Sequence, residues 1–196
     1  MKPVALIASL VVVLSLSGCA TEKKYSHFNI EKGEYSGAVE KRLRTANLYK
    51  KFDTIMIADV IYNDEWLRTL WVEEQVKIKR LGDDDKKMLL RLQKREDKKE
   101  ATFILCVYTS EDKWNDFSRK DSRWSVLLES ANGLTRPTSI IKVRQKNLQM
   151  RDSFPFNTTF REFYSVTFLR DKIGVLPYKL LLSSPLGSVK FTWSAE

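Results

Sequence analysis

The chain has 196 residues, of which 43% are hydrophobic and 30% charged, with a formal net charge of +9. This hydrophobic content is ordinary for a globular protein and predicts a buried core. The positive charge is spread along the chain, which favours weak attraction to anionic lipid headgroups over a nucleic-acid surface. One histidine and two cysteines are too few for a typical zinc site or a histidine-based nucleophile triad.

The N-terminal segment has the composition of an export signal. Lys2 precedes an apolar run from Val4 to Ser17, and the small residues Ser17 and Gly18 lie just before Cys19. A membrane-spanning helix needs about 20 apolar residues, whereas this chain turns polar at Thr21. We therefore expect residues 1–18 to be a cleaved signal peptide.

The sequence Leu16-Ser17-Gly18-Cys19 resembles the lipobox of bacterial lipoproteins. The resemblance implies diacylglycerol in thioether linkage to Cys19, cleavage before this residue and acylation of the new amino group. In that family a residue other than Asp after the cysteine implies delivery to the outer membrane, and Ala20 fits this pattern. The expected location is the cell envelope, at the periplasmic face of the outer membrane. An ordinary signal peptide with a chance cysteine, or a short uncleaved anchor, is the alternative.

Residues 19–35 are polar and without clear periodicity, so they predict a flexible tether between the lipid and a folded body. The only histidine, His27, lies in this tether. Cys106 is therefore far in sequence from any base that could generate a thiolate, and its apolar neighbours predict a small buried side chain.

Residues 36–100 are predicted to form a helical region. From an N-cap at Ser36, apolar residues recur at steps of three and four, which predicts an amphipathic helix to about Tyr62. A second helix begins after Asn63 or Asp64 and ends before Gly82. A third follows from Lys86 to Lys99, preceded by three aspartates that complement the helix dipole rather than forming a calcium loop.

The aromatic residues from Tyr49 to Tyr62, and from Trp66 to Trp71, fall within these predicted helices. Such a stripe can bind a partner or lie on a membrane, but it more often packs against its own domain.

Residues 101–196 predict an antiparallel β-domain, because short apolar or alternating segments alternate with turn residues. Asn132-Gly133 indicates a tight hairpin, and Ser184 to Gly187 a turn between the last two strands. The predicted strands are Thr102 to Thr109, Arg123 to Ser130, Ser139 to Gln145, Phe160 to Leu169, Tyr178 to Leu182 and Ser188 to Trp193.

The expected fold class is α+β, with the N-terminal amphipathic helices packed against a C-terminal antiparallel β-sandwich. Six or seven strands in about 95 residues pack most naturally in this way. A small open sheet covered by the helices is the alternative.

The segment between the first two predicted strands is a candidate binding loop. It mixes aromatic rings with cations, which are enriched at recognition surfaces. The alternative is structural: Trp124 enters the core, while the other two rings cover the sheet edge. The candidate binding residues are Trp114, Phe117, Arg119, Lys120 and Arg123.

The sequence contains no motif for catalysis, a metal or a cofactor that rises above these signals. We expect a lipid-anchored, non-catalytic binding, scaffold or accessory protein of the envelope, with the membrane and another envelope protein or anionic headgroups as partners. A carrier of lipid or another hydrophobic ligand is the alternative, and a hydrolase with spatially paired carboxylates is a third hypothesis.

Overall fold

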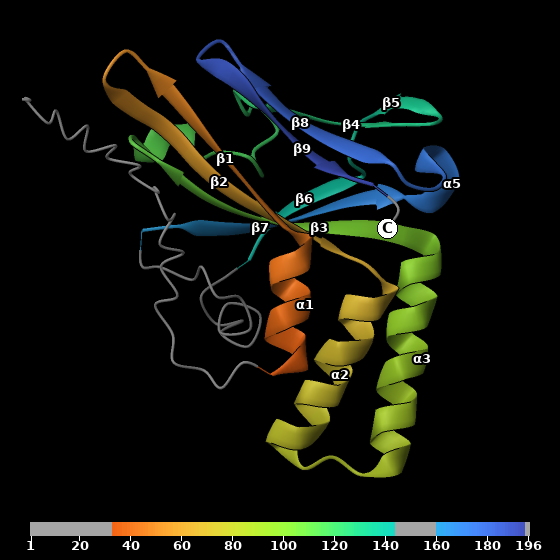
Figure 1. The fold of residues 1–196 in the computed structure, drawn as a ribbon. Helices are drawn as coiled ribbons and strands as arrows, with labels where there is room; N and C mark the ends of the chain where they lie inside the picture. Colours follow the sequence, from red (N-terminus) through yellow and green to blue (C-terminus); the bar gives the residue numbers. More distant parts are fainter. Residues whose placement is uncertain (1–32, 144–159, 195–196) are drawn as a thin grey trace, which may run out of the picture.

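The computed structural model describes residues 33–143 and 160–194. Cys19, the predicted signal peptide and most of the predicted tether lie outside the described residues. The described chain has a mixed fold with two antiparallel sheets and several helices (Figure 1), in agreement with the α+β class.

The helices are α1 (Glu34–Arg42), α2 (Glu65–Lys79), α3 (Asp83–Lys99), the 3₁₀ helix η1 (Asp112–Trp114) and the short α5 (Arg170–Ile173). The strands are β1 (Leu43–Lys50), β2 (Asp53–Asn63), β3 (Glu100–Thr109), β4 (Ser125–Ser130), β5 (Gly133–Thr135), β6 (Ser139–Lys142), β7 (Glu162–Leu169), β8 (Tyr178–Ser184) and β9 (Gly187–Trp193). One sheet has the order β1-β2-β3-β7-β6 and the other β5-β4-β8-β9.

The helix predicted from Ser36 to about Tyr62 is wrong beyond Arg42. The chain forms the β1–β2 hairpin there, so the predicted helical region of residues 36–100 contains two strands of the five-stranded sheet. Strand β2 is buried on both faces along most of its length. A continuous apolar run of this kind fits a helical period as well as a doubly covered strand, and periodicity alone cannot separate the two.

The second and third predicted helices correspond to α2 and α3. Asp64 caps α2, because its Oδ1 accepts a hydrogen bond of 2.8 Å from the backbone N–H of Leu67. Asp83, Asp84 and Asp85 occupy the first turn of α3, as the dipole argument predicts.

The predicted strands of the C-terminal half correspond to β3, β4, β6, β7, β8 and β9. The Asn132-Gly133 hairpin also forms, with Gly133 at φ 98°, but it joins β4 to the short β5. Strand β6 pairs with β7 in the other sheet and ends at Lys142.

The five-stranded sheet has a core on each face, because successive side chains of a strand point to opposite sides. In β3, Phe103 and Leu105 face the four-stranded sheet, and Ile104 and Cys106 face α1 and α2. Figure 1 shows α1, α2 and α3 on one side of this sheet and the four-stranded sheet on the other. Cys106 is fully buried, as predicted.

The core between the sheets is rich in large aromatic side chains. Phe103 stacks on Tyr62 at 5.0 Å between ring centroids and meets Trp193 of β9 at 5.1 Å. The buried residues of this core include Met56, Val60, Leu105, Tyr164, Val166, Phe168, Leu128, Tyr178, Leu180, Leu182 and Phe191.

Candidate functional site

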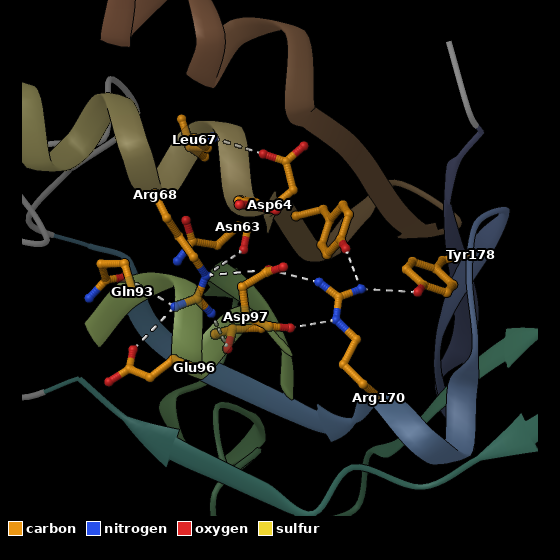
Figure 2. A network of polar contacts seen from close by, with 12 residues as sticks. Asn63, Asp64, Leu67, Arg68, Gln93, Glu96, Asp97, Arg170 and Tyr178 are labelled. Atoms are coloured by element: carbon orange, nitrogen blue, oxygen red, sulfur yellow. Dashed lines mark hydrogen bonds and ion pairs between the residues drawn. The ribbon is translucent and has the colours of Figure 1, made fainter. Parts of the chain in front are cut away.

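A cluster of two arginines and one aspartate joins α2 and α3 to both sheets (Figure 2). We call Arg68, Asp97 and Arg170 the arginine clamp. Asp97 Oδ1 lies 2.7 Å from Arg170 Nη2 and 3.7 Å from Arg68 Nε, so one carboxylate oxygen faces two guanidinium groups. Arg170 Nε also donates to the backbone carbonyl of Asp97 at 2.8 Å.

The guanidinium of Arg68 uses all three of its nitrogens within the protein. Its Nε donates to the carbonyl of Asn63, Nη1 to Gln93 and Glu96, and Nη2 to Thr102 Oγ1 at 3.0 Å. The side chain is 5% exposed. These contacts provide hydrogen-bond acceptors for all three nitrogens of the buried guanidinium. Arg68 therefore connects the helices to each other and to the sheet, and is not a ligand-binding residue.

Arg170 completes the clamp by contacting two tyrosines from different sheets. Its Nη1 donates to the hydroxyl of Tyr62 in β2 at 2.8 Å and to that of Tyr178 in β8 at 3.2 Å. Tyr178 in turn donates to the carbonyl of Gly174 at 2.6 Å. Burial raises the pKa of Tyr62 to about 12, although the positive charge of Arg170 opposes this rise. The Tyr62 hydroxyl therefore stays neutral at physiological pH and acts as a hydrogen-bonding group.

The sequence offered no signal for this cluster, because its three members lie far apart in the chain, in helices α2, α3 and α5. Burial alone would lower the pKa of Arg170, but the neighbouring Tyr62 and Asp97 raise it, so this guanidinium stays charged. In the clamp, Arg68 is buried, Asp97 and Arg170 are partly buried, and each charge faces an opposite charge. This pairing is typical of a structural ion-pair network rather than of a reactive site.

A second buried ion pair lies on the helix-facing side of the five-stranded sheet. Asp59 in β2 accepts a hydrogen bond from Thr45 in β1 and pairs with Arg161 just before β7. The pKa of Arg161 is raised: burial would lower it, but the negative charge of Asp59 and a hydrogen bond with Cys106 overcome that effect. Cys106 is thus both buried and partnered, which is the environment of a structural cysteine.

Partly buried aspartates in the described residues share this pattern. Each faces an arginine, which leaves its charge compensated inside the protein. The pairs are Asp59 with Arg161, Asp64 with Arg42, Asp97 with Arg68 and Arg170, and Asp116 with Arg123.

The predicted binding loop, residues 111–124, is held firmly against the core. Phe117 and Trp124 are both buried and stack at 5.3 Å between ring centroids. The indole N–H of Trp124 donates to the carbonyl of Trp114 at 2.7 Å. Tyr164, fully buried in β7, places its hydroxyl 2.8 Å from Asn115 Oδ1. Trp124 therefore enters the core, and Phe117 is buried with it instead of covering the sheet edge, so the Phe117 ring does not lie on the surface of the loop.

The cations of this loop remain on the surface, but most are paired within the loop. Arg119 makes two hydrogen bonds of 3.1 Å with Asp121, and Arg123 Nε lies 3.9 Å from Asp116. The hydrogen bond from Arg119 lowers the pKa of Asp121. Lys120 is exposed and has no ion-pair or hydrogen-bond partner among the described residues. Trp114, near the start of the same loop, is half-buried.

A different surface lies at the turn between β1 and β2, which the sequence pattern had placed inside a helix. We call Tyr49, Lys50, Lys51 and Phe52 the hairpin tip. Phe52 is completely exposed and Tyr49 is 59% exposed. Lys51 adopts a left-handed backbone conformation with φ 58°. Neither lysine has an ion-pair or hydrogen-bond partner in the part of the chain that the structure describes.

The described residues contain no group of three or more His, Cys, Asp or Glu side chains arranged to hold a metal ion. None of the helices in residues 33–143 and 160–194 combines the length and apolar character needed to cross a membrane. Comparison of the chain with protein-family models, curated proteins and solved structures finds no match.

Proposed function

We propose that this chain is a lipid-anchored protein of the cell envelope that holds another envelope protein without catalysing a reaction. The anchor is a lipid on Cys19, and the body is a β-sandwich with helices packed on one of its faces. The partner binds at loop 111–124, chiefly through Trp114, Arg119, Lys120 and Arg123. Delivery to the periplasmic face of the outer membrane belongs to the same proposal.

The main support for a binding role is that loop 111–124 has a fixed backbone and exposed cations. The Phe117–Trp124 stack and the Tyr164–Asn115 hydrogen bond fix its backbone while its cations stay on the surface. A loop that is ordered before binding loses less conformational entropy when a partner arrives. Cations that are already paired can exchange an internal carboxylate for one on an acidic partner, which contributes more to specificity than to affinity.

The pairing of the buried carboxylates supports a non-catalytic role. A glycosidase-type mechanism needs two carboxyl groups that face one substrate in different protonation states. Asp59, Asp64 and Asp97 instead face guanidinium groups. The carrier alternative gains no specific support from the core between the sheets, where Phe103, Tyr62 and Trp193 contact one another directly.

Site-specific photocrosslinking tests the binding role in intact cells. A photoreactive residue in place of Lys120 should give one discrete crosslinked product, whereas the same residue in place of Arg136, which is exposed after β5, should not. Charge reversal by Arg119→Glu should weaken the crosslink at position 120. Equal labelling from positions 120 and 136 would contradict a partner at this loop.

Acyl labelling tests the anchor separately. Cys19→Ser should abolish incorporation of labelled fatty acid and release the protein from membranes. Cys106→Ala changes the other cysteine, which is buried, and should leave labelling intact. Continued labelling of the Cys19→Ser variant would exclude Cys19 as the lipidated residue.

A further inference from the structure

The hairpin tip places two exposed aromatic rings and two lysines in four consecutive residues, and neither lysine has an ion-pair or hydrogen-bond partner within residues 33–143 and 160–194. An exposed phenyl ring leaves unused the burial free energy that packing in the core would have supplied. Arg119 and Arg123 are paired with carboxylates of their own loop. Lys50 and Lys51 make no ion pair among the described residues, although Asp53 lies opposite Lys50 in the hairpin. The tip is therefore apolar and positively charged at the same place.

The strands present this tip on a firm base. The β1–β2 pairing continues to Lys50 and Asp53, whereas β3 pairs with β2 only as far as Met56. The hairpin thus extends about 10 Å beyond the neighbouring strand. Near the tip, the side chain of Leu48 packs directly against the backbone of Gly187 in β9. A Cβ atom built on Gly187 would lie 2.7 Å from a methyl group of Leu48, so only glycine leaves room for this contact. Figure 1 shows the β1–β2 and β8–β9 hairpins rising together, away from the helices.

From this geometry we infer that the hairpin tip inserts its two aromatic rings into the headgroup region of an anionic lipid bilayer. Aromatic rings partition to the boundary between headgroups and acyl chains, and lysines keep their charge in water while their stems cover apolar surface. Each lysine near an anionic surface adds attraction. The occupant is the membrane itself rather than a protein groove, because the tip protrudes and offers no concave surface to a partner.

The inference rests on the lipid anchor of the proposed function, and the chain length is compatible with it. Residues 19 to 33 can span at most about 50 Å when extended. From Glu34 to the tip, the nine residues of α1 and the eight of β1 cover at most about 40 Å. A lipid on Cys19 and the tip can therefore reach the same bilayer surface. The anchor raises the local concentration of the tip at that surface, so that a weak contact is sufficient.

Fluorescence of the full, acylated protein in lipid vesicles tests the contact. Phe52→Cys would carry an aromatic, polarity-sensitive label that takes the place of the phenyl ring. The label reacts at position 52 because Cys19 is blocked by its thioether and Cys106 is buried. In vesicles of phosphatidylcholine with phosphatidylglycerol, nitroxide lipids should quench this label and iodide in the water should not. Changing both Lys50 and Lys51 to Gln should lower the equilibrium constant for contact about 30-fold.

The matched control is a label at Val175, which is also exposed but follows α5 at the other end of the sheets. It should be quenched by iodide alone. Equal nitroxide quenching at positions 52 and 175, or an iodide-accessible label at 52 in anionic vesicles, would overturn the inference. Equal quenching at position 52 in pure phosphatidylcholine would overturn the role of the lysines. Protection that appears only after envelope proteins are added would assign the tip to a protein.

The outcomes also separate the two proposals. A protein that fails to float with the vesicles contradicts the lipid anchor. A protein that floats while its tip stays in water contradicts the membrane contact alone.

Discussion

The two ends of the molecule treat charge in opposite ways. At the end where α2 and α3 meet the sheets, Arg68 and Arg170 surround one carboxylate and make hydrogen bonds with most of their donors. At the hairpin tip, Lys50 and Lys51 stand in solvent beside an exposed phenyl ring. Cations close to aromatic rings are thus paired structural groups at one end of the molecule, whereas at the other end they are exposed to solvent.

The difference shows that partners and burial, rather than residue type, decide what a charged side chain does. A buried cation is tolerated only when carboxylates and carbonyls replace its water. An exposed cation needs no such compensation and contributes little to stability. Substitutions should therefore have large effects on folding at the clamp and small effects at the tip.

The largest effect is expected for Asp97→Ala. It leaves Arg68 and Arg170 without the carboxylate that both face, and breaking a buried ion pair costs about 3–5 kcal/mol of unfolding free energy. Denaturant unfolding measures the loss. Asp84→Ala, which removes a fully exposed carboxylate from the same helix, should cost less than about 0.5 kcal/mol. Similar losses in the two variants would show that the clamp does not hold the helices.

A smaller effect is expected in alkali from Tyr62. The pKa of Tyr62 in the folded protein is about 12, above the value of about 10 for a tyrosine in water, so between these pH values the folded state retains a proton that the unfolded state has lost. Stability is therefore full below pH 10 and falls as the pH rises through about 12, by about 2–3 kcal/mol. In the Tyr62→Phe variant, the unfolding free energy should fall by that much less between pH 10 and about 12, as measured by denaturant unfolding across this range. Tyr49→Phe, at the exposed tip, should leave the loss unchanged; the opposite ranking would contradict the buried environment of Tyr62.

Tyr164→Phe should cost about 1 kcal/mol, because it removes the hydrogen bond to Asn115 while keeping the ring in the core. Burial, together with the negative charges of Glu162 and Asp116, raises the pKa of Tyr164, so its hydroxyl is protonated and able to donate. Hydrogen exchange should become faster in loop 111–124 and stay unchanged in α2. Unchanged exchange in the loop would mean that the Phe117–Trp124 stack fixes it alone.

The smallest effect on folding is expected for Phe52→Ser. The ring is fully exposed, so the change should alter the unfolding free energy by less than about 0.5 kcal/mol. It should nevertheless abolish the contact of the tip with anionic vesicles. A large loss of stability would mean that the phenyl ring is packed in the folded protein and not free to enter a bilayer.

The strands of residues 101–196 could be predicted from the sequence because their local signals agree with one another. Asn132-Gly133 and Ser184 to Gly187 mark turns, and Val189, Phe191 and Trp193 alternate along one face of β9. Helices α2 and α3 were predictable for the same reason, since Asp64 caps one and Gly82 separates them. In these segments, local preference and tertiary burial favour the same structure.

The β1–β2 hairpin and the clamp could not be predicted in this way. Strand β2 is covered by the four-stranded sheet on one face and by α1 on the other, and this two-sided burial removed the alternation that identifies a strand. The clamp depends on Arg170, which lies next to Asp97 because β7 pairs with β3 and places the start of α5 beside the end of α3. Phe117 looked like a surface recognition residue because the sequence does not show that Tyr164 and Trp124 enclose it.

The sequence by itself determined the mixed class, the turns and caps, and the lipobox-like segment on which the proposed location rests. These features depend on backbone preferences and short motifs, which act over a few residues. Tertiary structure alone decided which aromatic and charged groups are buried and which are free. That outcome depends on contacts between residues far apart in the chain, and it separates the arginine clamp from the exposed hairpin tip.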